Sequence, residues 1–286
     1  MAIISIPFPG SKRNRVRELL DIMEKGGYTR MVEPFGGSCV IGVNLERKGY
    51  ECVCNDYDRF FDNFADKIAA KRHVVGELLA AGIEKHPTRT LTPRQRDFLK
   101  ELVTPYPPDV RQFLASNFMF SSRRTEYKGE DVNGFRYFFN SIDFERDEAY
   151  SKAIEALTLA SMDYRDFITR YVKTNDPKTL VVLDPPYLNS TQKGYKNGVF
   201  FGLAESVQLL KRMKSLRNDF VWFNQIEKDI KVILDLLDLD YTIKTKNTTM
   251  GGSGQKRQDV LAYVQTEGGG KNGKSESDHR YAKEIH

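Results

Sequence analysis

The chain of 286 residues is poor in cysteine, histidine and tryptophan, with three, four and one of them. Cys39, Cys52 and Cys54 leave an odd count, and Cys52 and Cys54 alternate in a predicted strand, so we expect small buried hydrophobic side chains in a reducing compartment. The histidines are scattered without a ligand pattern, so we expect no metal site. No apolar run has the length of a membrane span and no signal peptide opens the chain, so we expect a cytoplasmic protein without a membrane partner.

A strong excess of one charge is also missing. Lysine and arginine number 44 against 39 aspartate and glutamate residues, which gives a net charge of +5. This mild excess is compatible with a polyanionic partner but does not establish one. The length allows a sizeable core and suits one large α/β domain that carries a smaller insertion.

An apolar run, Thr179–Leu183, is followed directly by Asp184-Pro185-Pro186-Tyr187. The run predicts a fully buried strand of an α/β sheet, and such sheets bind ligands outside the carboxyl ends of their strands. The two prolines remove two backbone donors and prevent a helix from starting at once, which leaves carbonyl acceptors beside a carboxylate and an aromatic ring. A planar group that carries an amine fits this arrangement. The alternative is a proline turn with a solvent-facing aspartate.

Earlier segments predict a nucleotide-type site. Residues 31–38 predict a short strand and a glycine turn, followed by a helix, and the glycines allow the backbone to approach a ligand closely. A second strand ends near Asp56, 20 residues after Gly36, where an acidic residue can bind ribose hydroxyls. Lys12 lies in the first turn of a helix that Ser11 is predicted to cap, which suits an anionic group, with a solvated lysine as the alternative. Together these segments favour a ligand that contains adenosine.

The alternation of strands and helices stops for about 75 residues after the helix predicted at 60–81. Thr92 and Gln95 predict a capping box, with Pro93 at the first helical position. Residues 117–137 mix aromatic side chains with arginine and lysine and predict a β-hairpin. Arginine between aromatic residues suits contact with nucleic acid, and a structural hairpin kept soluble by its arginines is the alternative. Helical periodicity returns at about 146–159. The helix that follows the capping box is predicted to be broken by Pro105, Pro107 and Pro108.

The remaining segments predict the second half of the sheet. Asp163 is predicted to cap a helix, and a strand at 220–223 ends in Asn224. Two further strands are predicted at 241–246 and 259–264, and the polar loop at 193–201 is a candidate for a mobile lid.

In this order, the segments resemble the Dam-like (D12) class of DNA adenine-N6 methyltransferases, which use S-adenosylmethionine. The matching segments are residues 8–12, 32–38 with Asn44, 55–56, 161–166, 184–187 and 256–263. The resemblance implies an α/β fold, the Rossmann-like mixed sheet of S-adenosylmethionine-dependent methyltransferases, with an inserted, mostly helical target-recognition domain that carries a β-hairpin. It implies a catalytic domain at 1–70 and 156–265, a DNA target-recognition insertion at 71–155 and a disordered tail at 266–286.

The resemblance also implies three groups of site residues. In the catalytic group, Asp184 and the Pro185 carbonyl accept hydrogen bonds from the target amine, Pro186 follows, and Tyr187 stacks on the flipped base. The cofactor-binding group surrounds the strand ends and consists of Phe8, Lys12, Glu33, Pro34, Phe35, Gly36, Gly37, Ser38, Asp56, Asp163, Tyr164 and Asp184. The DNA-binding group consists of Asn117, Arg123, Arg124, Lys128, Arg136 and Lys256.

The implied reaction moves a methyl group from S-adenosylmethionine to the N6 amine of a flipped-out adenine in double-stranded DNA, with S-adenosylhomocysteine as the product and no metal. We expect a monomer, with a dimer on DNA as the alternative. Two other functions stay open: a methyltransferase acting on cytosine N4, RNA or a protein amide, and a DNA-binding relative that has lost catalysis. The segment at 117–137 lacks the Asn-Arg-Gly-rich pattern of enzymes that read GATC, so the target sequence does not follow.

Overall fold

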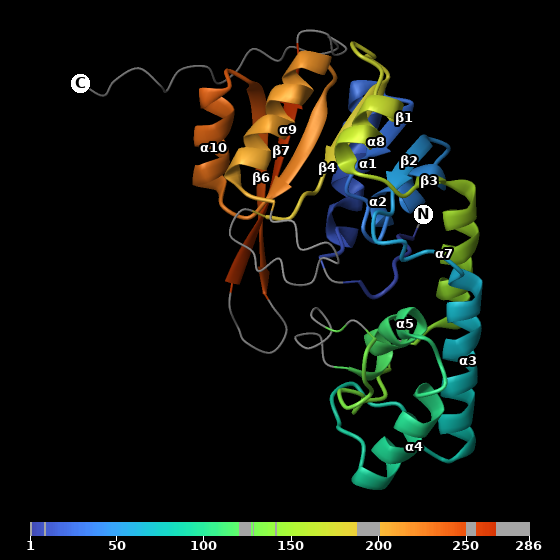
Figure 1. Ribbon diagram of the computed structural model, residues 1–286. Coiled ribbons are helices and arrows are strands. Elements are labelled where there is room, and N and C mark those ends of the chain that lie inside the picture. Colours follow the sequence, from blue (N-terminus) through green and yellow to red (C-terminus); the bar gives the residue numbers. More distant parts are fainter. Residues whose placement is uncertain are drawn as a thin grey trace.

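The computed structural model describes residues 2–8, 10–119, 127, 129–140, 142–187, 201–249 and 256–266, and at 248, 249, 256 and 257 it describes the backbone alone. Within these residues, seven strands form one mixed sheet in the order β3-β2-β1-β4-β5-β7-β6. The sheet and its helices make up one part of the molecule, and a helical lobe lies below it (Figure 1). The architecture is the mixed α/β sheet of methyltransferase type that the resemblance predicts.

The first five strands pair in parallel, and they are β1 (Arg30–Glu33), β2 (Glu51–Asn55), β3 (Thr158–Ala160), β4 (Thr179–Leu183) and β5 (Phe220–Asn224). From β1 the chain moves outward to β2 and β3, and from β4 it moves the opposite way to β5. The strand order therefore reverses between β1 and β4. In open α/β sheets, ligands bind at the carboxyl ends of the strands at this point of reversal.

Helices cover both faces of the sheet. They are the 3-10 turn η1 (Arg13–Arg15), α1 (Val16–Gly26), α2 (Val40–Glu46), α8 (Tyr164–Tyr171), α9 (Leu203–Leu216) and α10 (Glu227–Leu236). Leu180 and Val182 pack in the same core cluster as α1 and α2, whereas Val181 and Leu183 pack with α8, α9 and α10. Successive side chains of β4 therefore enter opposite layers, which explains why the whole strand is apolar.

The lower lobe has a hydrophobic core of its own. Its helices are α3 (Phe64–Ala80), α4 (Pro93–Val103), α5 (Pro108–Phe118) and α7 (Phe144–Ala156), and α3 and α7 run between the sheet region and the lobe (Figure 1). Buried side chains from α3, α4 and α5, such as Leu78, Leu99 and Leu114, meet in this core. The predicted capping box is confirmed, because Thr92 Oγ1 accepts from the Gln95 amide at 3.4 Å and the Thr92 amide donates to Gln95 Oε1 at 3.0 Å.

Two helix predictions around the sheet are wrong in detail. Ser11 does not cap the first helix, because η1 begins after Lys12 and α1 begins only at Val16, each without a side-chain cap. The helix predicted to continue to Leu159 ends at Ala156, and Thr158–Ala160 instead forms β3, paired with β2. Strand pairing at the sheet edge outweighs the local helical spacing there.

The segment at 117–137 also differs from its prediction at its start. Asn117 and Phe118 are the last residues of α5 and do not form a strand. The prolines after α4 are predicted only to break a helix, but Pro108 is the first residue of α5. Proline is tolerated there because the first amide of a helix has no hydrogen-bond partner within the helix. Within the described part of 127–137, one isolated bridge pairs Tyr137 with Thr90. Residues 120–126 and 128 lie outside the described residues, so the hairpin itself stays a prediction.

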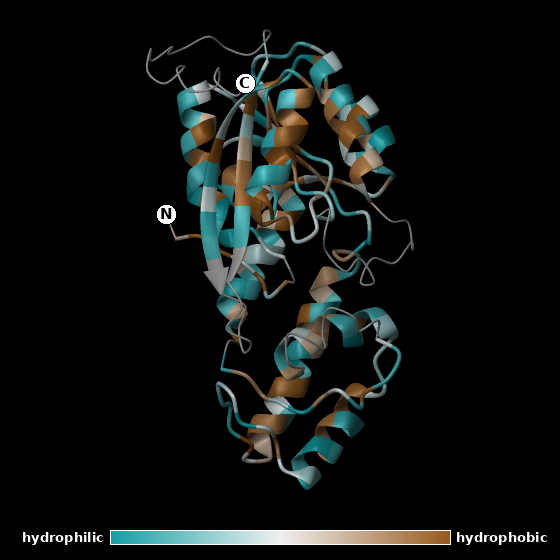
Figure 2. Ribbon diagram, turned by 90° about the vertical axis from the view of Figure 1, so that its left-hand side faces the viewer, coloured by the Kyte–Doolittle hydropathy of each residue, from teal (hydrophilic) through white to brown (hydrophobic). Residues whose placement is uncertain are grey.

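The last two strands are longer than the sequence indicates. β6 (Asp240–Thr249) and β7 (Lys256–Gln265) form an antiparallel hairpin, and β7 pairs with β5 only over Val260 to Val264. The far end of the hairpin therefore projects past the sheet, and this extension is hydrophilic where it is described (Figure 2). The predicted lid at 193–201, apart from Phe201, and the predicted tail, apart from Thr266, lie outside the described residues. None of the described helices combines the length and the apolar character needed to cross a membrane.

Candidate active site

The Asp184-Pro185-Pro186-Tyr187 segment lies at the point where the strand order reverses, directly after β4. Lys12, from the turn before η1, places its Nζ 2.7 Å from Asp184 Oδ2 and donates to the Gly10 carbonyl at 3.1 Å. The same Nζ lies 5.0 Å from the centre of the Tyr187 ring. The structure therefore joins the lysine predicted near the N-terminus to the carboxylate and the ring predicted after β4.

The residues around Asp184 change the pKa of its carboxyl group. Burial raises the pKa of Asp184, the Lys12 ammonium opposes this rise, and the neighbouring Asp259 adds to it. The side chain still has an exposed fraction of 18 %. A carboxylate offers about four acceptor positions, so Asp184 can keep its bond to Lys12 and still accept a hydrogen from a ligand amine.

Tyr187 contacts a second carboxylate that the sequence reasoning missed. Its hydroxyl donates to Asp259 Oδ1 at 3.4 Å, and Asp259 Oδ2 lies 2.7 Å from Nε of the fully buried Arg15. Burial and the nearby carboxylates of Asp184 and Asp259 raise the pKa of Tyr187, so its phenol is neutral. Arg15 and Asp259 are 244 positions apart, and no local pattern signals their pairing.

Glu33, the last residue of β1, lies beneath this cluster. Its side chain is buried, and Oε2 accepts from the thiol of Cys54 at 3.4 Å. Burial raises the pKa of Glu33 to about 8, and the negative charge of Asp184 adds to the rise. Cys39, Cys52 and Cys54 are all free and buried, as predicted. Glu33 is therefore a buried, protonated neighbour of Asp184, and its predicted contact with a cofactor stays a prediction.

The glycine turn after β1 packs tightly. The Gly36 amide donates to the Asn55 carbonyl at 3.1 Å, and a Cβ at Gly36 would lie 2.9 Å from Cys39 Sγ. Gly37 has φ +49°, and a Cβ there would lie 3.3 Å from the ring of Phe8. Both positions favour glycine: a side chain at Gly36 would collide with Cys39 and the Asn55 backbone, and one at Gly37 would be strained by the positive φ and crowd Phe8. Ser38 is buried next in the chain, and its carbonyl accepts from the Tyr150 hydroxyl at 2.6 Å.

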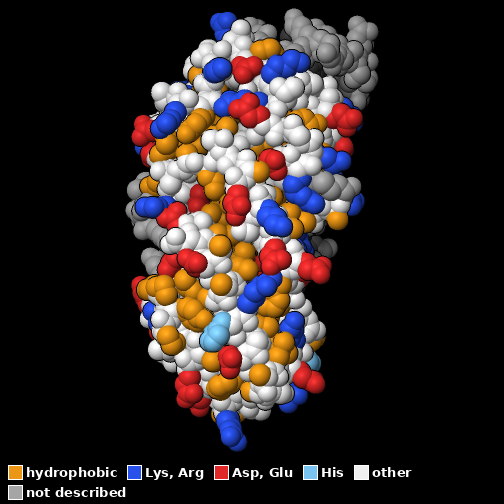
Figure 3. All heavy atoms as spheres, turned by 90° about the vertical axis from the view of Figure 1, so that its right-hand side faces the viewer, with side chains coloured by type: hydrophobic (Ala, Val, Ile, Leu, Met, Phe, Trp, Pro, Cys, Tyr) orange, Lys and Arg blue, Asp and Glu red, His pale blue; other side chains and the backbone are white. Residues whose placement is uncertain are grey.

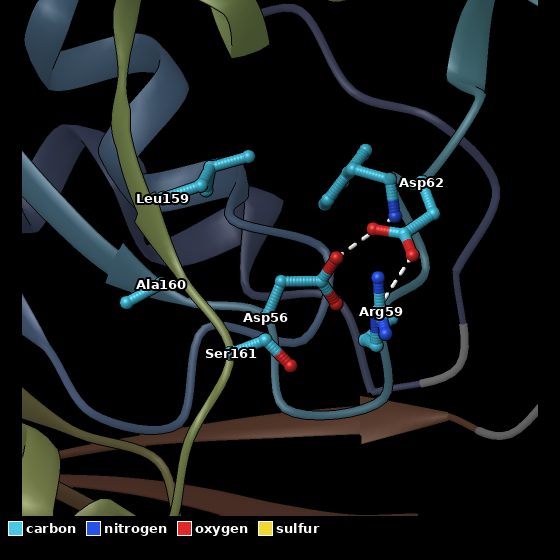
Figure 4. A pocket seen from close by; sticks show the side chains of 7 residues that line it. Asp56, Arg59, Asp62, Leu159, Ala160 and Ser161 are labelled. Atoms are coloured by element: carbon cyan, nitrogen blue, oxygen red, sulfur yellow. Dashed lines mark hydrogen bonds and ion pairs between the residues drawn. The ribbon is translucent and has the colours of Figure 1, made fainter.

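Asp56, at the end of β2, lies on the wall of a pocket of about 450 Å³ (Figure 4). Its two oxygens accept from the backbone amides of Phe60 and Phe61 at 2.9 and 2.8 Å. Burial raises the pKa of Asp56, and these two amides oppose the rise. The other residues lining the pocket are Arg59, Phe61, Asp62, Leu159, Ala160 and Ser161. The strand ends of β2 and β3 thus share one hollow, and Asp56 keeps acceptor positions that hydroxyl groups can use.

An aromatic cluster lies beside the glycine turn. The ring of Phe35 lies 5.0 Å from the ring of Tyr164 and 5.6 Å from that of Phe201. Asp163 is the N-cap of α8, as predicted, and accepts from the Arg165 amide at 2.8 Å. The cap holds Tyr164 in the first turn of α8, where its ring is tilted by 32° to that of Phe35 and the Arg165 guanidinium lies 4.9 Å from its centre.

Comparison with known proteins shows which family has this order of motifs. Residues 8–251 match the D12 class of N6 adenine-specific DNA methyltransferases. The chain belongs to this family. Membership makes the protein a methyltransferase and implies S-adenosylmethionine as the methyl donor.

Individual relatives are distant. A Haemophilus influenzae protein, provisionally named a methyltransferase, is 26 % identical over 227 residues, which cover 73 % of this chain and 72 % of that protein. Precorrin-6y C5,15-methyltransferase from Geobacter metallireducens GS-15 shares 8 % identity with a TM-score of 0.36, covering 93 % of this chain and 99 % of that one. The delta-N METTL16 MTase domain shares 8 % identity with a TM-score of 0.35, covering 87 % and 80 %. Scores this low assign neither fold nor function by themselves.

The strand ends offer groups of the kind that S-adenosylmethionine needs: a glycine turn without side chains, open acceptor positions on Asp56 and the aromatic ring of Tyr164. Their contacts with the methyl donor stay predictions. Across the described part of the chain, no group of three or more His, Cys, Asp or Glu side chains could hold a metal ion.

The predicted DNA-binding residues are less well placed. Asn117 is fully buried in α5, and its amide donates to Ser116 Oγ at 2.9 Å. Arg136 is half-buried, and its Nε donates to the Asn133 carbonyl at 3.4 Å. Lys256 begins β7, at the end of the projecting hairpin. Arg123, Arg124 and Lys128 lie outside the described residues, and the DNA contacts of all six stay predictions.

Proposed function

We propose that this methyltransferase methylates the N6 amine of adenine in duplex DNA after the base has left the stack. The observation that supports the proposal is the position of Asp184-Pro185-Pro186-Tyr187 at the sheet's point of reversal, where the Asp184 carboxylate and the Tyr187 ring lie beside Lys12. Membership of an N6 adenine-specific DNA methyltransferase family supports adenine in DNA as the substrate.

The Asp184 carboxylate and the Pro185 carbonyl would make the N6 amine a better nucleophile. The lone pair of an aromatic amine is delocalised into the ring, so the N6 nitrogen is a poor nucleophile in its planar form. Hydrogen bonds to Asp184 and to the Pro185 carbonyl would draw both N–H bonds to one side, which directs the lone pair to the other. Bound S-adenosylmethionine supplies a methyl group on a positively charged sulfur. The N–CH3 bond forms as the S–CH3 bond breaks, and the nitrogen then loses one proton.

Lys12 and Asp184 prepare the site for this step. The ammonium compensates the buried carboxylate before the base arrives, and burial keeps the pKa of Asp184 above its ordinary value. A carboxylate with a raised pKa accepts a proton more readily, so Asp184 can take up the proton that the methylated amine releases. Tyr187 offsets part of the cost of base flipping, which is a few kcal/mol, because stacking on an aromatic ring contributes about 1–3 kcal/mol.

We also propose that two parts of the chain have different functions. Residues 1–70 and 156–265 would bind the methyl donor and carry out transfer, and residues 71–155 would recognise the target. The separate core of the lower lobe supports this division. Figure 3 shows acidic and basic side chains interspersed on the face that carries α3 and α7, which does not favour a polyanion. DNA would instead bind on the side of the strand ends, between the sheet and the lobe.

The experiment is incubation with methyl-labelled S-adenosylmethionine and mixed-sequence duplex DNA, followed by nucleoside analysis. Label in N6-methyladenine supports the proposal, and the methylated sites then give the target sequence. Label in N4-methylcytosine, in RNA or in protein contradicts it, as does a failure to label DNA although the donor binds. The Asp184→Ala variant is the matched negative control.

A further inference from the structure

A second ion pair lies beside Tyr187 and has no part in the mechanism above. Arg15 is the last residue of η1 and is fully buried although it carries a permanent charge. Its Nε lies 2.7 Å from Asp259 Oδ2, its Nη1 lies 2.7 Å from Glu18 Oε2, and its Nη2 donates to the carbonyls of Lys244 and Asp259. A buried guanidinium with this many partners has a single orientation, and it fixes the carboxylate that it holds.

The turn η1 connects this pair to the catalytic one. The Arg15 amide donates to the Lys12 carbonyl at 2.8 Å, so one backbone turn carries both cations. Lys12 holds Asp184 at the end of β4, and Arg15 holds Asp259 on β7. Tyr187 lies between the two carboxylates: its hydroxyl is 3.4 Å from Asp259 Oδ1 and also interacts with Asp184, and the Lys12 ammonium lies 5.0 Å from its ring centre.

We propose that Arg15 and Asp259 are positioning residues that hold the ring of Tyr187 in the orientation needed to stack on the target base. Asp259 fixes the hydroxyl end of the ring, and Arg15 fixes Asp259. The ring itself is the part that touches the base. This inference rests on the proposed function, since it assigns the stacking role to Tyr187.

The structure provides the reason why such support is needed. The prolines before Tyr187 donate no backbone hydrogen bonds, so the segment after β4 lacks the ladder that holds a strand in place. A ring at the end of such a segment would rotate about its side-chain torsions and would lose that freedom again when the base stacks on it. Fixing the ring in advance lowers this cost of binding.

The test is a double-mutant cycle between Asp259 and Tyr187, measured on duplex DNA with methyl-labelled S-adenosylmethionine. Asp259→Asn should lower kcat about tenfold and leave the KM for S-adenosylmethionine within about twofold. In a Tyr187→Phe background, the same substitution should change kcat less than about twofold, because the hydroxyl that Asp259 holds is gone. Glu51→Gln, which removes the exposed carboxylate partner of Arg30 away from the site, should keep kcat near wild type. Losses that simply multiply would overturn the proposal.

A second measurement needs no DNA. In protein labelled with 3-fluorotyrosine, the 19F resonance that disappears in Tyr187→Phe belongs to Tyr187. Asp259→Asn and Arg15→Lys should shift or broaden this resonance and leave that of Tyr28, which is held by Asp219 at 2.5 Å, unchanged. An unmoved Tyr187 resonance in Asp259→Asn would overturn the proposal. Should wild-type protein fail to methylate adenine, the proposed function fails, whereas this resonance still tests the contact.

Discussion

Two lysine–aspartate pairs have nearly equal lengths, one at the strand ends of the sheet and one between the helices that connect the sheet to the lower lobe. Lys12–Asp184, at 2.7 Å, lies at the strand ends of the sheet, and Lys71–Asp147, at 2.6 Å, joins α3 to α7. The first pair has exposed side-chain fractions of 10 % and 18 %, and the second has 1 % for both residues. A partly open pair can admit a ligand amine as a further partner of the carboxylate, whereas a closed pair can only hold its helices together. The two pairs have the same chemistry and differ in how far a ligand can reach them. We call Lys12–Asp184 the open pair, which belongs to the candidate site, and Lys71–Asp147 the closed pair, which belongs to the scaffold.

The buried pair belongs to a connection between the two regions. Burial lowers the pKa of Lys71, and the charge of Asp147 opposes this. One turn earlier on α3, Lys67 Nζ donates to the Phe60 carbonyl at 2.9 Å and lies 3.4 Å from Asp109 Oδ2 at the start of α5. The helix therefore links the loop that holds Asp56 to the lower lobe.

The strongest test of the open pair is Asp184→Ala. The substitution removes the acceptor that aims the amine, so methyl transfer should fall by about 10²–10³-fold or more, the range seen when one aligned polar group of a catalytic site is lost. Binding of S-adenosylmethionine, measured by calorimetry, should stay within a few-fold. Asp147→Asn is the control in the closed pair, and its folded fraction should transfer methyl groups at the wild-type rate. Equal activity of Asp184→Ala and wild type would remove the proposed mechanism.

Lys71→Met tests the closed pair. It leaves the Asp147 carboxylate buried without its cation, which should lower the free energy of unfolding by about 3–5 kcal/mol. Urea denaturation followed by circular dichroism measures the change. The double variant Lys71→Met with Asp147→Leu should recover most of the loss, because two apolar side chains remove both charges. A variant that stays folded but no longer transfers methyl groups would contradict the purely structural role.

Glu33→Gln tests the buried carboxyl beneath the open pair. The pKa of Glu33 rises from 4.5 to about 8 on folding, so the protonated form favours the folded state. That contribution is complete below pH 4.5 and is lost as the pH rises through about 8. Each pH unit above 4.5 removes about 1.4 kcal/mol from the wild type until the pH reaches about 8, so the glutamine variant should gain about 3 kcal/mol of unfolding free energy over wild type at pH 7 and nothing at pH 4. Unfolding curves at both pH values measure this, and a gain that does not depend on pH would contradict it.

Lys12→Met should have the smallest of these effects. The ammonium opposes the rise in the pKa of Asp184, whereas Asp259 adds to that rise and Tyr187 opposes it. Without the lysine, the pKa of Asp184 should rise further, and the acidic limb of the kcat profile should move to higher pH. Transfer assays between pH 5 and 9 locate the limb. Lys12→Arg should restore its position, and an unchanged limb in Lys12→Met would show that this cation does not act through Asp184.

Much of the sheet followed from the sequence. Thr179–Leu183 is buried along its whole length as predicted, and β5 (Phe220–Asn224) has the predicted bounds. The Thr92 capping box and the Asp163 cap also formed as expected. In each case the residues that decide the structure are neighbours in the sequence, so the sequence pattern is sufficient to predict it.

The helix α5 was predictable but missed. Pro108 at its first position, Asp109 in its first turn and the buried residues Val110, Phe113 and Leu114 form an ordinary amphipathic start. Reading the prolines only as breakers hid this signal. The consequence was a hairpin predicted to begin at Asn117, which the helix buries instead.

The sequence by itself determined the central strands β4 and β5, the segment after β4 and the family, because these depend on neighbouring residues and on an ordered set of motifs. Only the tertiary structure decided that Arg15 meets Asp259, that Lys71 meets Asp147 and that one lysine–aspartate pair is open while the other is closed. Such pairs form between elements that the sheet order and the helix packing bring together. The energy of an ion pair depends on how much water is excluded around it, and that is a property of the whole fold.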